Sequence, residues 1–155
     1  MAKRILELIL LILVVIVVSF FFSVDFSRQN QTEINNPNQV RILKIRNQVL
    51  NIEIADTDIK KIIGLSNRED LKKEEALLFV FETPGLYSFW MKDMNFPIDI
   101  AWIDENKKII HIESKVLPST YPKIFVSNSP AKYVLETQAG FFEDSEIKIG
   151  DLAEF

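Results

Sequence analysis

The sequence predicts a mostly β, α+β fold: a compact antiparallel β-barrel or sandwich with one or two short helices, preceded by an N-terminal transmembrane helix. Two observations after position 40 favour the β-rich domain. Short segments of alternating apolar residues recur there between turn residues, and no long helical pattern or internal repeat occurs. A third observation, a nearly continuous apolar run at the N-terminus, predicts the membrane helix.

The N-terminal run covers residues 5–22 and follows Lys3 and Arg4, with Glu7 and Ser19 as its only interruptions. At about 1.5 Å per residue a helix of this length spans about 27 Å, close to a hydrocarbon core of roughly 30 Å. We expect an uncleaved signal anchor with a cytoplasmic N-terminus and an extracytoplasmic domain. The alternative is a cleavable signal that yields a secreted protein, although an A-x-A cleavage site is absent.

These features divide the chain into a membrane segment over residues 1–26, a polar tether over 27–39 and one globular domain over 40–155. The tether is rich in Asn and Gln, contains Pro37 and has no apolar periodicity, as flexible linkers do. A domain of this length can bury a core without covalent staples. The chain has no cysteine, which excludes disulfides, thiolate nucleophiles and zinc–thiolate sites.

The domain begins with two alternating segments, Val40–Arg46 and Val49–Ala55, which predict strands joined by a turn at Asn47-Gln48. Thr57 is a suitable N-cap for a short helix that follows, and Gly64 is a suitable stop. Each of these signals is local, so the hairpin and the helix are predicted without reference to the rest of the domain.

The second half is expected to consist mainly of strands, after a short helix or turn over Glu69–Glu75. Asp104-Glu105-Asn106 predicts a turn between two of these strands, Pro118 and Pro122 mark an irregular stretch, and Gly150-Asp151 interrupts the last strand. The expected strands are Leu77–Phe81, Tyr87–Met91, Ile98–Ile103, Lys108–Glu113, Tyr133–Thr137 and Ile147–Phe155.

Charge and motif content exclude several classes of function. The net charge is −4, and Lys3, Arg4 and Glu7 contribute +1 to it, which leaves −5 for the rest of the chain. An acidic domain of this kind predicts no nucleic-acid partner. No cofactor motif and no calcium-loop spacing occur, so we expect no cofactor and no metal. His111 is the only histidine and no serine lies in a nucleophile elbow, which argues against a Ser-His-Asp triad.

The segment Phe89–Asp99 is the main candidate for a binding site. Alternation along a strand would place Trp90 and Lys92 on one side, and Phe89, Met91 and Asp93 on the other. An aromatic ring beside a cation suits a sugar or an anionic ligand. The structural alternative is that Phe89 and Met91 belong to the core and that Lys92 pairs with Asp99 or Glu136.

Further charged residues are candidates with structural alternatives of their own. Arg68 could hold a carboxylate or phosphate with both guanidinium nitrogens, or it could pair with Glu69, Asp70 or Glu136. Four acids could supply pairs for acid–base catalysis or calcium binding, although structural roles are the favoured interpretation: Asp93, Asp99, Asp104 and Glu136.

Several spaced motifs across residues 40–155 strongly resemble the bacterial and archaeal family called domain of unknown function 192. The resemblance implies one compact β-rich domain, often with an export signal, and implies no activity. The matching motifs are Gly64-Leu65-Ser66-Asn67-Arg68, Leu78-Phe79-Val80-Phe81, Phe89-Trp90-Met91-Lys92-Asp93, Pro97-Ile98-Asp99-Ile100, Tyr133-Val134-Leu135-Glu136, Ala139-Gly140 and Gly150-Asp151.

The chain departs from the usual family pattern at three places. Ser66 stands where the family has Met, Ala76-Leu77 stands where it has Gly-Met, and Asp93-Met94 stands where it has Asn-Thr. An ionised carboxylate cannot donate a hydrogen bond as an amide does, so Asp93 cannot take over a donor role of the family's Asn.

Three functions are compatible with these observations. The leading hypothesis is a membrane-anchored, extracytoplasmic accessory or ligand-binding module, whose ligand is an envelope glycan, peptide or protein. Its candidate binding residues are Arg68, Trp90, Lys92, Asp93, Asp99 and Glu136. The first alternative is a small cell-envelope hydrolase that uses Asp99 and Glu136 as acid and base. The second is a module that docks a protein through an exposed apolar patch of several hundred Å².

Overall fold

The computed structural model describes residues 41–155, so the predicted anchor over 1–26 and tether over 27–39 lie outside the described residues. Within 41–155, no helix has the length and apolar character needed to cross a membrane. The strands are β1 Arg41–Ile45, β2 Gln48–Ala55, β3 Glu75–Gly85, β4 Ser88–Phe89, β5 Ile98–Ile103, β6 Ile109–Val116, β7 Phe125–Val126, β8 Ala131–Gln138 and β9 Ala153–Glu154. The helices are α2 Asp58–Ile63, α3 Phe141–Asp144 and the 3-10 turn η1 Pro118–Thr120.

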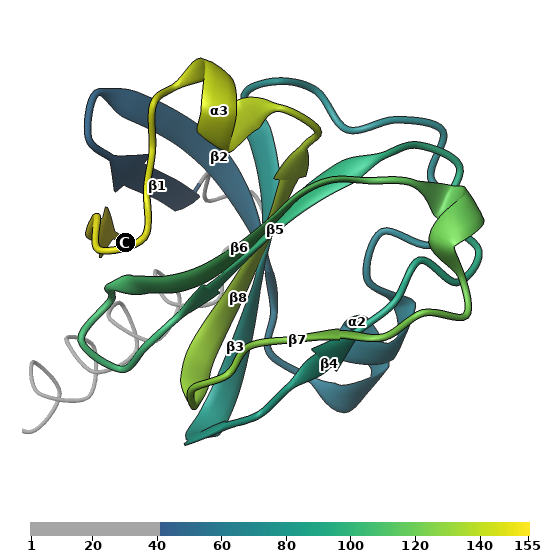
Figure 1. The fold of residues 1–155 in the computed structure, drawn as a ribbon, viewed down its shortest axis with the longest axis horizontal. Coiled ribbons are helices and arrows are strands. Elements are labelled where there is room, and N and C mark those ends of the chain that lie inside the picture. The colour runs from purple at the N-terminus through teal and green to yellow at the C-terminus, as the bar shows by residue number, and fades with distance from the viewer. Residues whose placement is uncertain (1–40) are drawn as a thin grey trace, which may run out of the picture. The chain divides into compact units, whose positions relative to one another are not determined.

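Seven strands form one strongly twisted sheet in the order β6-β5-β8-β3-β2-β1-β9, and β4 and β7 pair separately (Figure 1). The prediction of a mostly β fold with short helices is therefore confirmed. The all-antiparallel arrangement is wrong at one pair, because β2 and β3 run parallel. The chain between them includes α2 and crosses over before it re-enters the sheet, as a parallel connection requires.

Local signals predicted α2 correctly. The Thr57 side chain accepts a hydrogen bond from the Lys60 N–H at 3.4 Å, and Gly64 ends the helix with φ 53°. Over Glu69–Glu75 the chain bends and turns without a helix before β3 begins.

Two predicted strands are much shorter in the structure. Of Tyr87–Met91 only Ser88–Phe89 is a strand, because the chain turns at Lys92 and Asp93. Of Ile147–Phe155 only Ala153–Glu154 is a strand. The helix α3 was not predicted; Gly140 precedes it at φ 90°, a left-handed conformation that glycine adopts readily.

Hydrophobic clusters form on both faces of the large sheet. The first-face cluster joins Phe141 and Phe142 of α3 to residues such as Leu135, while the second-face cluster contains the adjacent Val134. Successive residues of a strand point to opposite faces, which explains this division. Figure 1 shows α3 on one side of the central strands and α2, β4 and β7 on the other.

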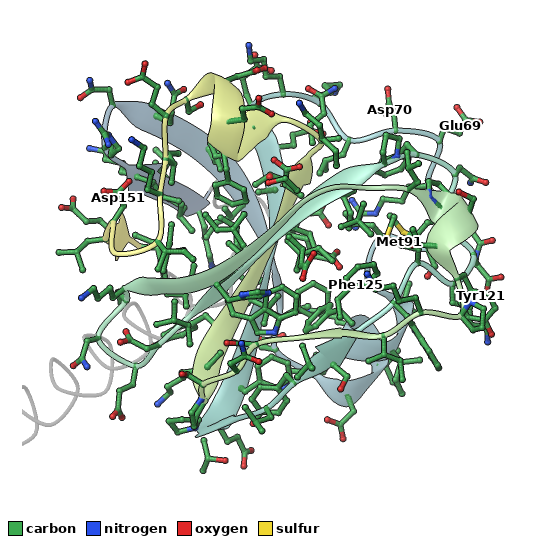
Figure 2. The ribbon with its side chains drawn as sticks, in the orientation of Figure 1. Glu69, Asp70, Met91, Tyr121, Phe125 and Asp151 are labelled. Carbon is green, nitrogen blue, oxygen red and sulfur yellow. The ribbon has the colours of Figure 1, made fainter. Side chains whose placement is uncertain are left out.

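The elements α2, β4 and β7 form a layer over the second face, and a hydrogen bond from a buried tryptophan attaches this layer to the sheet. Trp102 of β5 is fully buried, and its Nε1–H donates to the Tyr87 carbonyl at 2.9 Å. Met91 and Phe125 of β7 are buried, whereas Tyr121 lies at the edge of this layer (Figure 2). This attachment fixes the distance between the sheet and the layer, and the space left between them is the candidate site.

Candidate ligand pocket

Two buried acids lie on opposite faces of the sheet. In the pairing of β5 with β8, Asp99 stands opposite Thr137 and Ile100 stands opposite Glu136. Because neighbouring residues of a strand alternate in direction, Asp99 points to the first face and Glu136 to the second. The predicted acid–base pair of Asp99 and Glu136 is therefore wrong: the sheet itself separates the two carboxyl groups.

Asp99 has a structural role. Its Oδ1 accepts hydrogen bonds from the backbone N–H groups of Lys115 at 2.6 Å and Gly140 at 3.0 Å, and its Oδ2 accepts one from Phe142 at 3.2 Å. The side chain holds the β6 bulge at Lys115 against the start of α3. Both of its oxygens accept backbone hydrogen bonds and it does not line the pocket on the second face, so the structure gives Asp99 no contact with that pocket.

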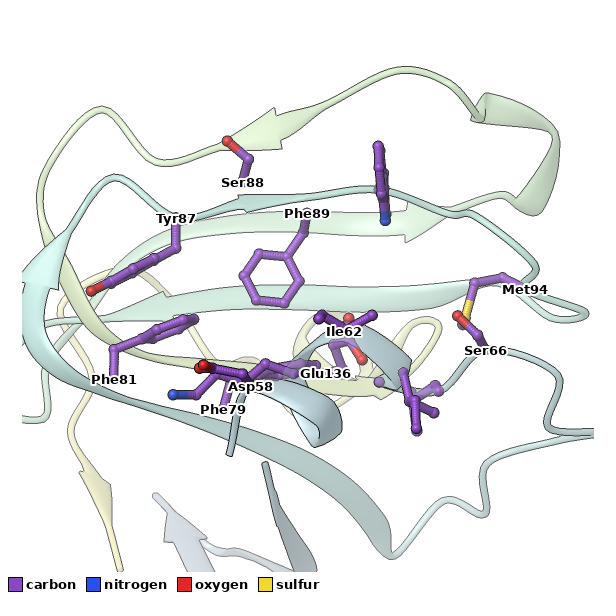
Figure 3. A pocket seen from close by; sticks show the side chains of 15 residues that line it. Asp58, Ile62, Ser66, Phe79, Phe81, Tyr87, Ser88, Phe89, Met94 and Glu136 are labelled. Carbon is purple, nitrogen blue, oxygen red and sulfur yellow. The ribbon is translucent and has the colours of Figure 1, made fainter. Parts of the chain in front are cut away.

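Glu136 lies in a pocket of about 410 Å³ on the second face (Figure 3). Only 5% of Glu136 is exposed, and its Oε2 has no hydrogen-bond partner among the described residues. Its neighbours across the sheet are Leu77 and Ile100, whose side chains have no polar atoms. Burial raises the pKa of Glu136 to about 8, and the positive charge of Arg68 opposes part of that rise.

The pocket walls are largely aromatic. The ring of Phe89 points into the pocket and meets Phe79 edge to face at 4.8 Å, while Phe81 stacks on Tyr87 at 3.4 Å between ring centroids (Figure 3). Trp90 completes the aromatic lining, and α2 contributes Asp58, Lys61, Ile62 and Ile63 to the wall.

Hydrogen bonds connect two loops beside the pocket, one over residues 66–68 and the other over residues 92–95. The Ser66 hydroxyl donates to the Lys92 carbonyl at 3.0 Å, and the Asn67 N–H donates to the Asp93 carbonyl at 2.8 Å. The Asn95 side chain donates to the Arg68 carbonyl at 2.8 Å. Asn67 and Asp93 have φ of 61° and 57°, a left-handed conformation that Asn and Asp tolerate better than most residues. Asp93 therefore contributes through its backbone here.

The other predicted site residues have mixed outcomes. Trp90 lines the pocket and is 53% exposed. Arg68 forms a two-pronged ion pair with Glu53, at 2.6 and 2.9 Å, rather than with Glu69, Asp70 or Glu136. That pair lowers the pKa of Glu53. Within residues 41–155 Lys92 makes no ion pair, so its predicted pairing with Asp99 or Glu136 is wrong.

Sequence reasoning missed most of the pocket lining. Phe79 and Phe81 are predicted only as residues of a strand, and Lys61 lies within the helix predicted between Thr57 and Gly64. Phe89 belongs to the candidate segment Phe89–Asp99, with a place in the core as its structural alternative. One signal was present in the sequence. In the predicted strand Tyr133–Thr137, alternation places Glu136 on the same side as the apolar Val134, which is an unusual position for an acid.

The predicted docking surface stays a prediction. Ile59, Ile62 and Ile63 of α2 are 71%, 81% and 54% exposed, and two of them also line the pocket.

No group of three or more His, Asp or Glu side chains in the described part of the chain is arranged to hold a metal ion.

Curated relatives come from archaea. The chain is 28% identical over 111 residues to a UPF0127 protein of Pyrococcus furiosus, which covers 68% of this chain and 87% of the relative. It is 26% identical over 103 residues to a UPF0127 protein of Thermococcus kodakarensis, which covers 65% of this chain but only 62% of that relative's length.

Two solved bacterial structures share the fold. One, a protein of unknown function from Novosphingobium aromaticivorans, has a TM-score of 0.71 at 24% identity, over 77% of this chain and 90% of that one. The other is described as a proposed transcription regulator from Sinorhizobium meliloti, with a TM-score of 0.70 at 26% identity over 73% of this chain and 91% of that one. The family domain of unknown function 192, described as Uncharacterized ACR, matches residues 41–155. The chain therefore belongs to this family.

Proposed function

We propose that this protein is a ligand-binding module whose pocket takes a small, largely apolar molecule with one polar group directed at Glu136. The observation that carries the proposal is the Glu136 Oε2 at the pocket wall, which has no hydrogen-bond partner in the part of the chain that the structure describes. Leaving a buried polar atom unsatisfied costs about 1–3 kcal/mol, and buried polar atoms are rarely left so. A ligand that donates a hydrogen bond to this oxygen removes that cost.

The remaining features of the pocket support this proposal. Its volume of about 410 Å³ falls within the roughly 300–1,000 Å³ that is typical of small-molecule sites. The lining combines several aromatic and aliphatic side chains with polar groups from α2, the loop after it and β8, and such a mixture is typical of small-molecule sites. Ring contacts such as those between Phe79, Phe89 and Trp102 hold the walls in place before any ligand arrives.

The test is a screen of small apolar compounds against the full chain, with thermal stabilisation as the readout. Compounds that stabilise the protein should lose their effect in Glu136→Leu, which removes the acceptor and fills the space beside it. They should keep their effect in Ile149→Ala, a control at an exposed position that does not line the pocket. A screen without any stabilising compound, or one whose compounds act equally on Glu136→Leu, contradicts the proposal.

We also propose that the module is membrane-anchored and extracytoplasmic. The support is the apolar run over residues 5–22 behind Lys3 and Arg4. Protein extracted from membranes should have the full-length mass, and protease added to intact spheroplasts should digest the domain. A domain that stays protected from the protease, or a protein recovered only from the soluble fraction, contradicts this location.

A further inference from the structure

The aromatic wall of the pocket already binds a positive charge. The Lys61 ammonium lies 4.9 Å from the centroid of the Phe81 ring. The face of an aromatic ring carries negative charge density and attracts a cation within about 6 Å. Five aromatic residues line this one pocket, so a ligand cation would meet the same kind of surface.

Glu136 provides the matching anion. No residue within 41–155 donates to its Oε2, and an ammonium group carries the N–H donors that this oxygen needs. The guanidinium of Arg68, whose charge acts on Glu136, uses two of its nitrogens to bind Glu53 and makes no hydrogen bond to the Oε2 of Glu136. A carboxylate and aromatic ring faces in one pocket form a more favourable environment for a cation than for an anion.

We propose that the pocket takes a small organic ammonium, whose charged head binds the Glu136 carboxylate against the aromatic rings and whose apolar body fills the rest of the space. This inference names the ligand class of the proposed function and rests on it. Lys61 then competes with the ligand, because both place a positive charge on the same wall and repel each other.

Ammonium binding should be coupled to proton release. Burial raises the pKa of Glu136 to about 8, so the carboxyl carries a proton at pH 7 and should lose it when a cation binds. Affinity for an ammonium should therefore rise between pH 6 and pH 8. The other charged and titratable groups around this pocket are Asp58 and Lys61 of α2, Arg68 of the following loop, and Tyr87 of the covering layer.

The test compares three probes of similar shape and different charge: 2-phenylethylamine, 2-phenylethanol and phenylacetate. Each is titrated calorimetrically into the full chain at pH 7.5. We expect the amine to bind at least about tenfold more tightly than the other two, which corresponds to about 1.4 kcal/mol. Glu136→Gln should reduce amine binding to the level of the alcohol and leave alcohol binding unchanged. Lys61→Met should strengthen amine binding about threefold.

The outcomes separate this inference from the proposed function. If the alcohol or the acid binds as tightly as the amine and Glu136→Leu abolishes that binding, the ammonium assignment is overturned and the ligand pocket remains. If Lys61→Met weakens amine binding, the assignment is also overturned; this variant decides the matter even if Glu136→Gln folds poorly. If neither these probes nor any screened compound binds, both proposals fail.

Discussion

The large sheet buries one carboxyl group on each face, and the two are satisfied very differently. Asp99 on the first face accepts three backbone hydrogen bonds, all within 3.2 Å. Glu136 on the second face leaves one oxygen without a partner among the described residues. The exposed fractions are 0% and 5%, so burial alone does not distinguish the two side chains.

The difference shows that the partners of a buried acid, rather than its depth, indicate its role. The donors to Asp99 come from the β6 bulge and the start of α3, so the side chain joins two segments of the fold. Within residues 41–155 the Oε2 of Glu136 has no hydrogen-bond partner, and the charge of Arg68 offsets its desolvation only in part. A natural sequence departs from its own packing rules mainly at functional sites, which is why we propose a ligand pocket on the second face.

Replacing each acid by its amide should give the largest effect and tests the comparison directly. Asp99→Asn leaves one acceptor oxygen and turns an NH₂ group toward backbone N–H donors, so we expect a loss of about 3 kcal/mol in the free energy of unfolding. Glu136→Gln should change that free energy by less than about 1 kcal/mol at pH 5. Urea denaturation of both variants measures this difference. Equal losses would mean that both acids are structural.

The pH dependence of stability should also differ between the parent and Glu136→Gln, and this effect should be smaller. Burial raises the pKa of Glu136 from 4.5 to about 8, so between these values the folded protein keeps a proton that the unfolded chain releases. Glu136 therefore lowers stability progressively as the pH rises through this window, and the effect is complete above pH 8. We expect Glu136→Gln to gain on the order of 2 kcal/mol relative to the parent between pH 5 and pH 7.5.

Urea denaturation of the parent and of Glu136→Gln at pH 5, 6.25 and 7.5 measures this gain. Asp99 does not contribute to the difference between the two stability profiles, because both proteins contain it. Parallel stability profiles for the two proteins would show that Glu136 is ionised in the folded state throughout, and the contrast between the two acids would then lose its electrostatic basis.

Local signals were sufficient to predict the elements at the start of the domain. The hairpin of β1 and β2 and the helix α2 follow from alternation, from the Thr57 cap and from Gly64. The covering layer was predicted less well. The strand expected over Tyr87–Met91 ends early because Asp93 turns the chain in a left-handed conformation, and Asp93 also receives a hydrogen bond from the distant Asn67. A contact of that range leaves no local pattern.

The candidate site was predicted in part for the same reason. Trp90 and Glu136 were named from the sequence, and the structure places both in one pocket. Asp99 was grouped with Glu136 because alternation orders the faces within one strand but does not fix the register between two strands. A shift of one residue moves a side chain to the other face. The aromatic wall was missed because it is assembled from β3 and the segment around β4, which only the tertiary fold brings together.

Arg68→Met should give the smallest effect, and it tests whether the charge of Arg68 lowers the pKa of Glu136. The Arg68–Glu53 pair is 35% and 62% exposed, so its loss should cost at most about 1 kcal/mol of stability. The pKa of Glu136 should nevertheless rise further, because the charge of Arg68 lowers it in the parent. Carboxyl ¹³C chemical shifts of Glu136, followed by NMR over a pH titration, measure that change.

The matched control is Arg46→Met, which removes another exposed Arg–acid pair, the one with Asp151 at 3.6 Å. Arg46 is not among the groups that shift the pKa of Glu136. An increase in the pKa of Glu136 in Arg68→Met alone would place Arg68 in the electrostatic environment of the pocket. An equal increase in both variants would show that Glu136 responds to the net charge of the domain, and Arg68 would then have no specific part in the site.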